Sequence, residues 1–129
     1  MTTPATTPTY HTVTPCLVVP DADRELRFLV DGLGGAEVEC TRRTDGTIMH
    51  AEIRLGDSLV MLGQHTDTYP ARPNSLYLWV GDVDATYERA LQHGAASEAP
   101  PEDKPYGHRN AGVTDPGGIT WWIAAPVRR

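Results

Sequence analysis

Cysteine, long apolar runs and clustered positive charge are all scarce in this sequence, and each scarcity excludes a class of protein. The chain has two cysteines in 129 residues, Cys16 and Cys40, which is too few for a disulfide framework. We therefore expect reduced thiols and a cytoplasmic protein. No apolar run approaches the roughly 20 residues that a membrane-spanning helix needs, so we expect no membrane partner. Residues 1–12 lack the charged and apolar regions of a signal peptide, and their threonines and prolines predict a flexible tail.

The charge balance argues against nucleic acid as a partner. The formal net charge is -6 at pH 7 and the sequence pI is near 5.2. The basic pairs 42–43 and 128–129 are isolated, whereas nucleic-acid-binding proteins gather lysine and arginine along one face. The acidic balance instead favours encounter with cationic small molecules. The length and the 40% hydrophobic content are typical of one globular domain, which we expect to span residues 13–129.

An internal repeat is the strongest positive feature. Asp21 and Asp82 lie 61 positions apart, and so do Glu37 and Glu98. Around each pair the sequence predicts a strand, an Asp-capped helix, a glycine that ends the helix, and a second strand. A half this short can rarely bury its own sheet. We therefore expect the two halves to share one structure, with a ligand between them.

Hydrophobic periods and turn residues predict the order strand, helix, strand, strand, strand in both halves. The first half spans residues 13–62 and the second spans 75–125. Residues 63–74 have no period and are expected to link them. The predicted strands are 13–19, 36–42, 47–55, 58–62, 76–80, 96–98, 108–114 and 119–124.

Helix ends and one loop can also be predicted. The first helix begins at Asp21 or Asp23 and runs through Leu33 to a pair of glycines. The second helix begins near Val83 and ends before a single glycine. The adjacent prolines at 100–101 are expected to interrupt the strand that begins at residue 96, and an irregular loop is expected to follow them.

Four stretches carry a resemblance to a known family: Leu17–Ala22 (LVVPDA), Met49–Ser58 (MHAEIRLGDS), Pro100–Gly107 (PPEDKPYG) and Asp115–Ala124 (DPGGITWWIA). With the repeated element order, they resemble the vicinal oxygen chelate superfamily of glyoxalases, bleomycin-resistance proteins and dioxygenases, and within it the PhnB-like branch. The resemblance implies an α+β fold in which tandem βαβββ modules form a cupped mixed sheet around a cavity, with the helices outside. It also implies a homodimer and a cavity formed within one chain or between two.

Metal-using members of this superfamily place one ligand in the first and last strand of each half. Aligned on the neighbouring motifs, those positions fall near Thr14, Met61, Ser75 and Trp122, and they are again paired by the shift of 61. Hydroxyls bind metals weakly, a thioether is soft, and an indole only donates hydrogen bonds. We therefore expect no metal cofactor at these positions.

Strand alternation extends the expected ligand-binding face from these four positions. Cys16 follows Thr14 on the same face, and Tyr77 and Trp79 follow Ser75. The resulting surface is apolar and aromatic, as small-molecule pockets usually are. The alternative is that the aromatic side chains simply fill the cup as core.

His50 and Glu52 share one face of the predicted strand 47–55. They are candidates for catalysis, with His50 as a general base that Glu52 orients. The alternatives are an exposed polar face or a structural hydrogen bond. A divalent metal held by His50, Glu52 and His108 is a further alternative.

Tyr106 and Arg109 follow the proline-rich segment, at the expected mouth of the cavity, and are candidate ligand-binding residues; ordinary surface contacts are the alternative. The sequence thus favours a metal-independent small-molecule-binding protein, for example one that sequesters an antibiotic or another planar apolar ligand. The alternative is a lyase, isomerase or dioxygenase that uses a noncanonical metal or acid–base chemistry at His50 and Glu52.

Overall fold

The computed structural model describes residues 10–127, so most of the predicted tail lies outside the described residues. The elements follow the predicted order. They are β1 (Cys16–Val19), α1 (Ala22–Arg27), the π-helical turn η2 (Phe28–Gly32), β2 (Ala36–Arg42), β3 (Ile48–Leu55), β4 (Ser58–Gln64), β5 (Ser75–Trp79), α2 (Val83–Gln92), β6 (Ala96–Asp103), β7 (His108–Thr114) and β8 (Thr120–Pro126).

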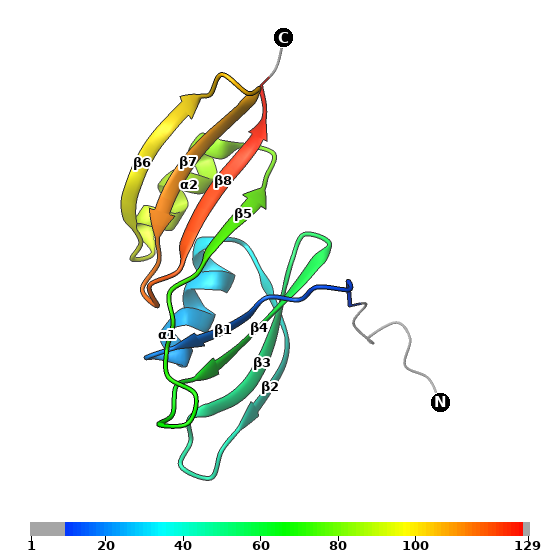
Figure 1. Ribbon diagram of the computed structural model, residues 1–129, viewed down its shortest axis with the longest axis vertical. Helices are drawn as coiled ribbons and strands as arrows, with labels where there is room; N and C mark the ends of the chain where they lie inside the picture. The colour runs from blue at the N-terminus through cyan, green and yellow to red at the C-terminus, as the bar shows by residue number, and fades with distance from the viewer. Residues whose placement is uncertain (1–9, 128–129) are drawn as a thin grey trace.

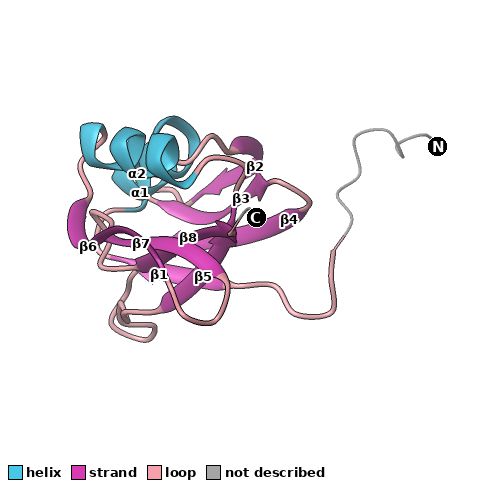
Figure 2. Cartoon of the chain, turned by 90° about the horizontal axis from the view of Figure 1, so that it is seen from above, coloured by secondary structure: helices cyan, strands magenta, loops and turns pink. Residues whose placement is uncertain are grey.

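Each half forms one four-stranded mixed sheet, and the two sheets have the same topology. Their strand orders are β1-β4-β3-β2 and β5-β8-β7-β6. The first strand of each half pairs in parallel with the last, and the other pairs are antiparallel. The sheets follow one another along the molecule's long axis (Figure 1), and α1 and α2 lie together on one side of both (Figure 2). On the opposite side of the two sheets, residues 10–127 place no helix.

Aspartate caps fix where both helices begin. The Asp21 carboxylate accepts the backbone N–H of Arg24 at 3.1 Å, and the Asp82 carboxylate accepts that of Ala85 at 3.0 Å. Asp21, rather than Asp23, is therefore the cap of α1. The last turn of the first helix widens into η2 and ends at Gly34, whose φ of 79° suits glycine.

The prediction for the prolines at 100–101 was wrong, because β6 continues through them to Asp103. Among the described strands, β6 lies at the edge of its sheet and pairs with β7 alone, and its register shifts between Ser97 and Ala99 and again between Ala99 and Glu102. Proline lacks an N–H to donate, and edges and bulges are the places in a sheet where that loss is tolerated.

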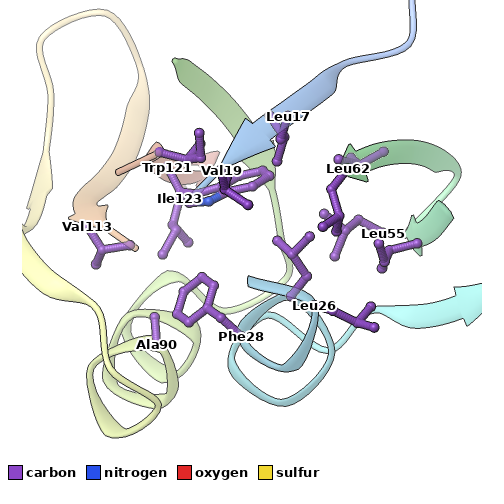
Figure 3. Close-up of a cluster of buried hydrophobic side chains, with 14 of the residues drawn as sticks. Leu17, Val19, Leu26, Phe28, Leu55, Leu62, Ala90, Val113, Trp121 and Ile123 are labelled. Carbon is purple, nitrogen blue, oxygen red and sulfur yellow. The ribbon is translucent and has the colours of Figure 1, made fainter. Parts of the chain in front are cut away.

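The two halves share one hydrophobic core. Leu17, Val19 and Phe28 of the first half belong to the same buried cluster as Trp121 and Ile123 of the second. Figure 3 shows the Phe28 ring between the two helices. Neither half could bury these side chains alone, as the repeat predicts. Between residues 10 and 127, no helix is both long and apolar enough to cross a membrane.

A buried carboxyl group also joins the halves. Glu25 of α1 is fully buried, and a Cβ built on Gly117 in the β7–β8 turn would lie 2.5 Å from its Oε1. In the same turn Asp115 accepts the backbone N–H of Ile119 at 3.0 Å and the indole N–H of Trp121 at 2.7 Å. Burial, and then the neighbouring Asp115, raise the pKa of Glu25 to about 10. Glu25 is therefore neutral at physiological pH.

Candidate functional site

Strand alternation separates the core side of each sheet from its open side. Leu17 and Trp121 are buried against the helices, whereas Cys16, Tyr77 and Trp79 are exposed on the side without helices. The registers place Cys16 beside Met61 in the first sheet and Tyr77 beside Trp122 in the second. The predicted ligand-binding residues of the strands therefore lie on the open sides of the two sheets.

The open side of the second sheet carries an aromatic cluster, made of Tyr77, Trp79, Tyr106 and His108. The His108 ring centroid lies 4.8 Å from that of Trp79, 5.1 Å from that of Tyr106 and 5.8 Å from that of Tyr77. The tyrosine and tryptophan side chains are nevertheless 42%, 54% and 62% exposed at Tyr77, Trp79 and Tyr106. Large aromatic surface is thus held in place but left uncovered.

Asn110 on β7 fixes the two tyrosines of the aromatic cluster. Its side-chain N–H groups donate to the hydroxyls of Tyr77 and Tyr106, each at 3.0 Å. The Tyr77 hydroxyl is then free to donate to Nδ1 of His108, also at 3.0 Å. Asn110 is buried, and its Oδ1 has no hydrogen-bond partner among residues 10–127. A buried acceptor without a partner is uncommon and calls for an explanation.

Trp122 lies flat against β7 because Gly112 leaves room for it. A Cβ built on Gly112 would come within 2.5 Å of the indole ring. Gly112 faces Trp122 directly in the β7–β8 register. Trp122 is therefore packed on the sheet beside Tyr77 and forms part of the floor of this face.

The open side of the first sheet carries a polar cluster, made of Tyr10, Glu39, His50 and Glu52. Nε2 of His50 donates to Oε2 of Glu52 at 2.7 Å and lies 3.8 Å from Oε2 of Glu39. The Tyr10 hydroxyl donates to Oε1 of Glu52 at 2.7 Å. The structure thus brings His50 and Glu52 together as predicted, and adds two groups that the sequence did not indicate.

Two ionisations in the polar cluster are shifted. Burial raises the pKa of Glu52, but the hydrogen bonds from His50 and Tyr10 and the nearby imidazole outweigh burial, so the net shift is downward. The hydrogen bond to Glu52 is the largest cause of a raised pKa at Tyr10, followed by burial. Glu52 is therefore a carboxylate and Tyr10 a neutral phenol near pH 7.

Other predicted residues lie apart from these clusters. Arg109 alternates with His108 and Asn110 along β7, so it points to the other side of the sheet. There its guanidinium donates to Asp84 at 2.8 Å and to Asp103 at 3.0 Å, and it lines an open groove of about 810 Å³. His108 belongs to the aromatic cluster, so it does not join His50 and Glu52 in the suggested metal site.

The four positions that hold metal in metal-using relatives do not fit a metal here. Met61 and Trp122 offer a thioether and an indole, and their strand neighbours Cys16 and Tyr77 offer one thiol and one phenol. Thr14 precedes β1, and its hydroxyl donates to the His11 carbonyl at 3.4 Å. No pair of strong ligands for a divalent ion is present in this set, which includes Ser75.

A groove lies between the halves and opens onto the aromatic cluster. Its volume is about 420 Å³, and Tyr77 and Trp79 form one wall while Leu55 and Val60 of the first half form another. His11 lies at its edge. None of the four residues of the polar cluster lines this groove.

Sequence comparison identifies the family. The sequence model of the Glyoxalase/Bleomycin resistance protein/Dioxygenase superfamily matches residues 10–123. The chain belongs to this superfamily. The uncharacterized protein Mb0911c of Mycobacterium bovis is similar as well, with 32% identity over 90% of this chain and 84% of its own length.

Solved structures of other proteins have the same fold. TioX from Micromonospora sp. ML1 is similar with a TM-score of 0.74 and 27% identity, over 92% of this chain and 98% of TioX. The PhnB protein of Bacillus cereus is similar with a TM-score of 0.65 and 19% identity, over 89% of this chain and 99% of that protein. These similarities confirm the predicted α+β glyoxalase/bleomycin-resistance fold.

Proposed function

We propose that this chain binds an apolar, planar small molecule on its aromatic cluster, with no metal at the four first- and last-strand positions. One observation carries the proposal: Tyr77, Trp79 and Tyr106 are largely exposed, yet they are held in a fixed arrangement through Asn110 and His108. Rigid aromatic surface supplies contact area at little cost in side-chain entropy. Such a surface is suited to stacking on a flat ligand.

The aromatic rings and the net charge of the chain both favour a ligand with a positive group. Ring faces attract cations, and the chain carries a net charge of -6, which biases encounter in the same direction. The Asn110 amide nitrogen already holds the two tyrosine hydroxyls, so the rings of Tyr77 and Tyr106 are the groups offered to a ligand. Sequestration of an antibiotic is one use of such binding, and the superfamily includes bleomycin-resistance proteins.

A homodimer forms part of the proposal. Tyr77, Trp79, Met49 and Val13 expose apolar surface, and surfaces of this kind commonly mark interfaces or ligand sites. A second copy would cover the open sides that the helices leave bare. We also propose a cytoplasmic location, on the basis of the free thiols, and a place in the PhnB-like branch, on the basis of the four sequence motifs and the PhnB fold neighbour.

A thermal-shift screen of chelator-treated protein tests the proposal. Planar cations such as ethidium and doxorubicin should raise the melting temperature, whereas non-aromatic cations such as spermidine should not. At a ligand concentration of 100 Kd the stabilisation is about 2.7 kcal/mol, on the order of 10 °C for a domain of this size. Stabilisation that appears only after a metal is added back would refute the metal-independent part.

The contact between His50 and Glu52 supports a second candidate, a small-molecule enzyme. Because the Glu52 carboxylate accepts the Nε2 proton, Nδ1 of His50 carries the lone pair of a general base. This candidate predicts that wild-type protein converts a bound compound to a product detectable by mass spectrometry. The His50→Gln variant should bind the same compound without converting it, and equal conversion by both proteins would refute the role of His50.

A further inference from the structure

Three side chains of the polar cluster combine the donor atoms of a metal site. Glu39 on β2 and His50 and Glu52 on β3 each place one ligand atom within 4.8 Å of the other two. The strand register accounts for this, since Glu39 faces Glu52 across the β2–β3 pair and Thr41 faces His50. The site is distinct from the first- and last-strand positions, although Glu52 adjoins Met61 in the β3–β4 pair.

Hydroxyl groups orient both carboxylates toward the same point. The Thr41 hydroxyl donates to Oε1 of Glu39, and the Tyr10 hydroxyl donates to Oε1 of Glu52. Each bond holds one oxygen and leaves Oε2 directed at Nε2 of His50. Hydrogen bonds that fix the outer atoms of ligands in this way are a regular feature of metal sites.

The two carboxylates also lack a strong cation. Among residues 10–127, neither Glu39 nor Glu52 forms an ion pair with a lysine or arginine, and their only ionic partner is His50. The Glu52 side chain is only 8% exposed. Hydrogen bonds from His50 and Tyr10 stabilise this carboxylate in part, and a divalent ion would add the positive charge that the described lysines and arginines do not supply.

We propose that Glu39, His50 and Glu52 bind a divalent first-row transition metal ion, with Zn²⁺ as the representative case. One imidazole and two carboxylates suit this class better than Mg²⁺ or Ca²⁺, which take oxygen ligands. In the present structure Nε2 of His50 lies 2.7 Å from Oε2 of Glu52 and 3.8 Å from Oε2 of Glu39. Small movements of these side chains would place all three atoms about 2.0–2.2 Å from a metal ion between them. Three protein ligands leave at least one coordination position open, on the exposed side of the sheet.

This proposal goes beyond ligand binding by the aromatic cluster and does not depend on it. It is incompatible with His50 as a base oriented through Nε2, because a metal bound at Nε2 replaces the proton that Glu52 accepts. The two roles therefore predict different responses to metal.

The test is calorimetric titration of chelator-treated full-length protein with ZnCl₂, together with the visible absorption of the Co²⁺-loaded protein. We expect one ion per chain and the ligand-field bands of bound Co²⁺. Loss of an outer-shell partner typically weakens metal binding by about 10- to 100-fold, so Glu39→Gln and His50→Gln, which each remove a direct ligand, should weaken Zn²⁺ binding by about 100-fold or more. Both side chains are 38% exposed, so both variants should fold, which circular dichroism would verify.

Matched controls keep the assignment specific. Glu37→Gln removes a carboxylate from the same strand outside the polar cluster, and His65→Gln removes an imidazole from the linker; neither should alter the affinity. The proposal is overturned if Zn²⁺ does not saturate a site. It is equally overturned if binding survives Glu39→Gln and His50→Gln unchanged, or if it is lost in a control variant.

Discussion

The buried carboxyl of Glu25 should make the stability of this protein fall as pH rises. Folding raises the pKa of Glu25 from 4.5 to about 10, so between these values the folded chain keeps a proton that the unfolded chain releases. Each pH unit in this window therefore lowers the free energy of unfolding by about 1.4 kcal/mol. Below pH 4.5 the carboxyl is neutral in both states, and the contribution no longer changes.

The Glu25→Gln variant isolates this effect. Glutamine keeps the neutral, similarly shaped side chain but cannot titrate, so the contribution of this site becomes independent of pH. From pH 6 to pH 8, wild-type protein should lose about 2.7 kcal/mol more unfolding free energy than the variant. Urea denaturation at pH 6, 7 and 8 measures the unfolding free energy of both proteins. Titrating groups that both proteins contain, such as Glu52 with its lowered pKa, contribute equally and drop out of the difference. Parallel pH profiles would show that Glu25 is not held neutral.

Two glycine variants test close packing. Gly117→Ala places a methyl group 2.5 Å from Oε1 of Glu25 and 2.8 Å from Cγ1 of Val19, so it should destabilise the fold by about 1–3 kcal/mol in urea denaturation; an unchanged midpoint would contradict the described junction. Gly112→Ala places its methyl 2.5 Å from the Trp122 ring, and displacement of the indole should change the tryptophan fluorescence maximum as well as lower stability. An unaltered spectrum would mean that Trp122 does not lie on β7.

The sequence predicts the fold well because its signals are local and repeated. Each half contains an aspartate that caps its helix, a glycine that ends the helix, and strands of alternating apolar residues. Both halves adopt the predicted order of elements. The path of β6 through the prolines at 100–101 is harder to predict, since it depends on this strand lying at the edge of the sheet. Edge position is a property of the assembled sheet rather than of the segment.

The site is predicted in part. Alternation places Tyr77 and Trp79 on the open face. On β7, Gly112 pairs with Trp122, so alternation from Gly112 toward the start of the strand would also have placed Asn110 and His108 on this face. Glu39 is different, because the register of β2 shifts between Glu37 and Glu39, and such an irregularity cancels the alternation on which the prediction rests. Tyr10 reaches Glu52 across 42 positions of sequence, a contact that no local pattern encodes.

Binding of a planar ligand to the aromatic cluster without metal can be measured in solution. The most direct measurement is the Kd of ethidium, followed by fluorescence in excess chelator, for wild type, Trp79→Ala and Tyr69→Ala. Tyr69 is an exposed aromatic residue of the linker and lies outside the cluster. Loss of the Trp79 ring should remove about 1–2 kcal/mol of binding free energy, which is roughly a 5- to 30-fold rise in Kd, while Tyr69→Ala should match wild type. Equal affinities in all three proteins would show that the aromatic cluster is not the binding site, and no binding until metal is restored would show that binding requires metal.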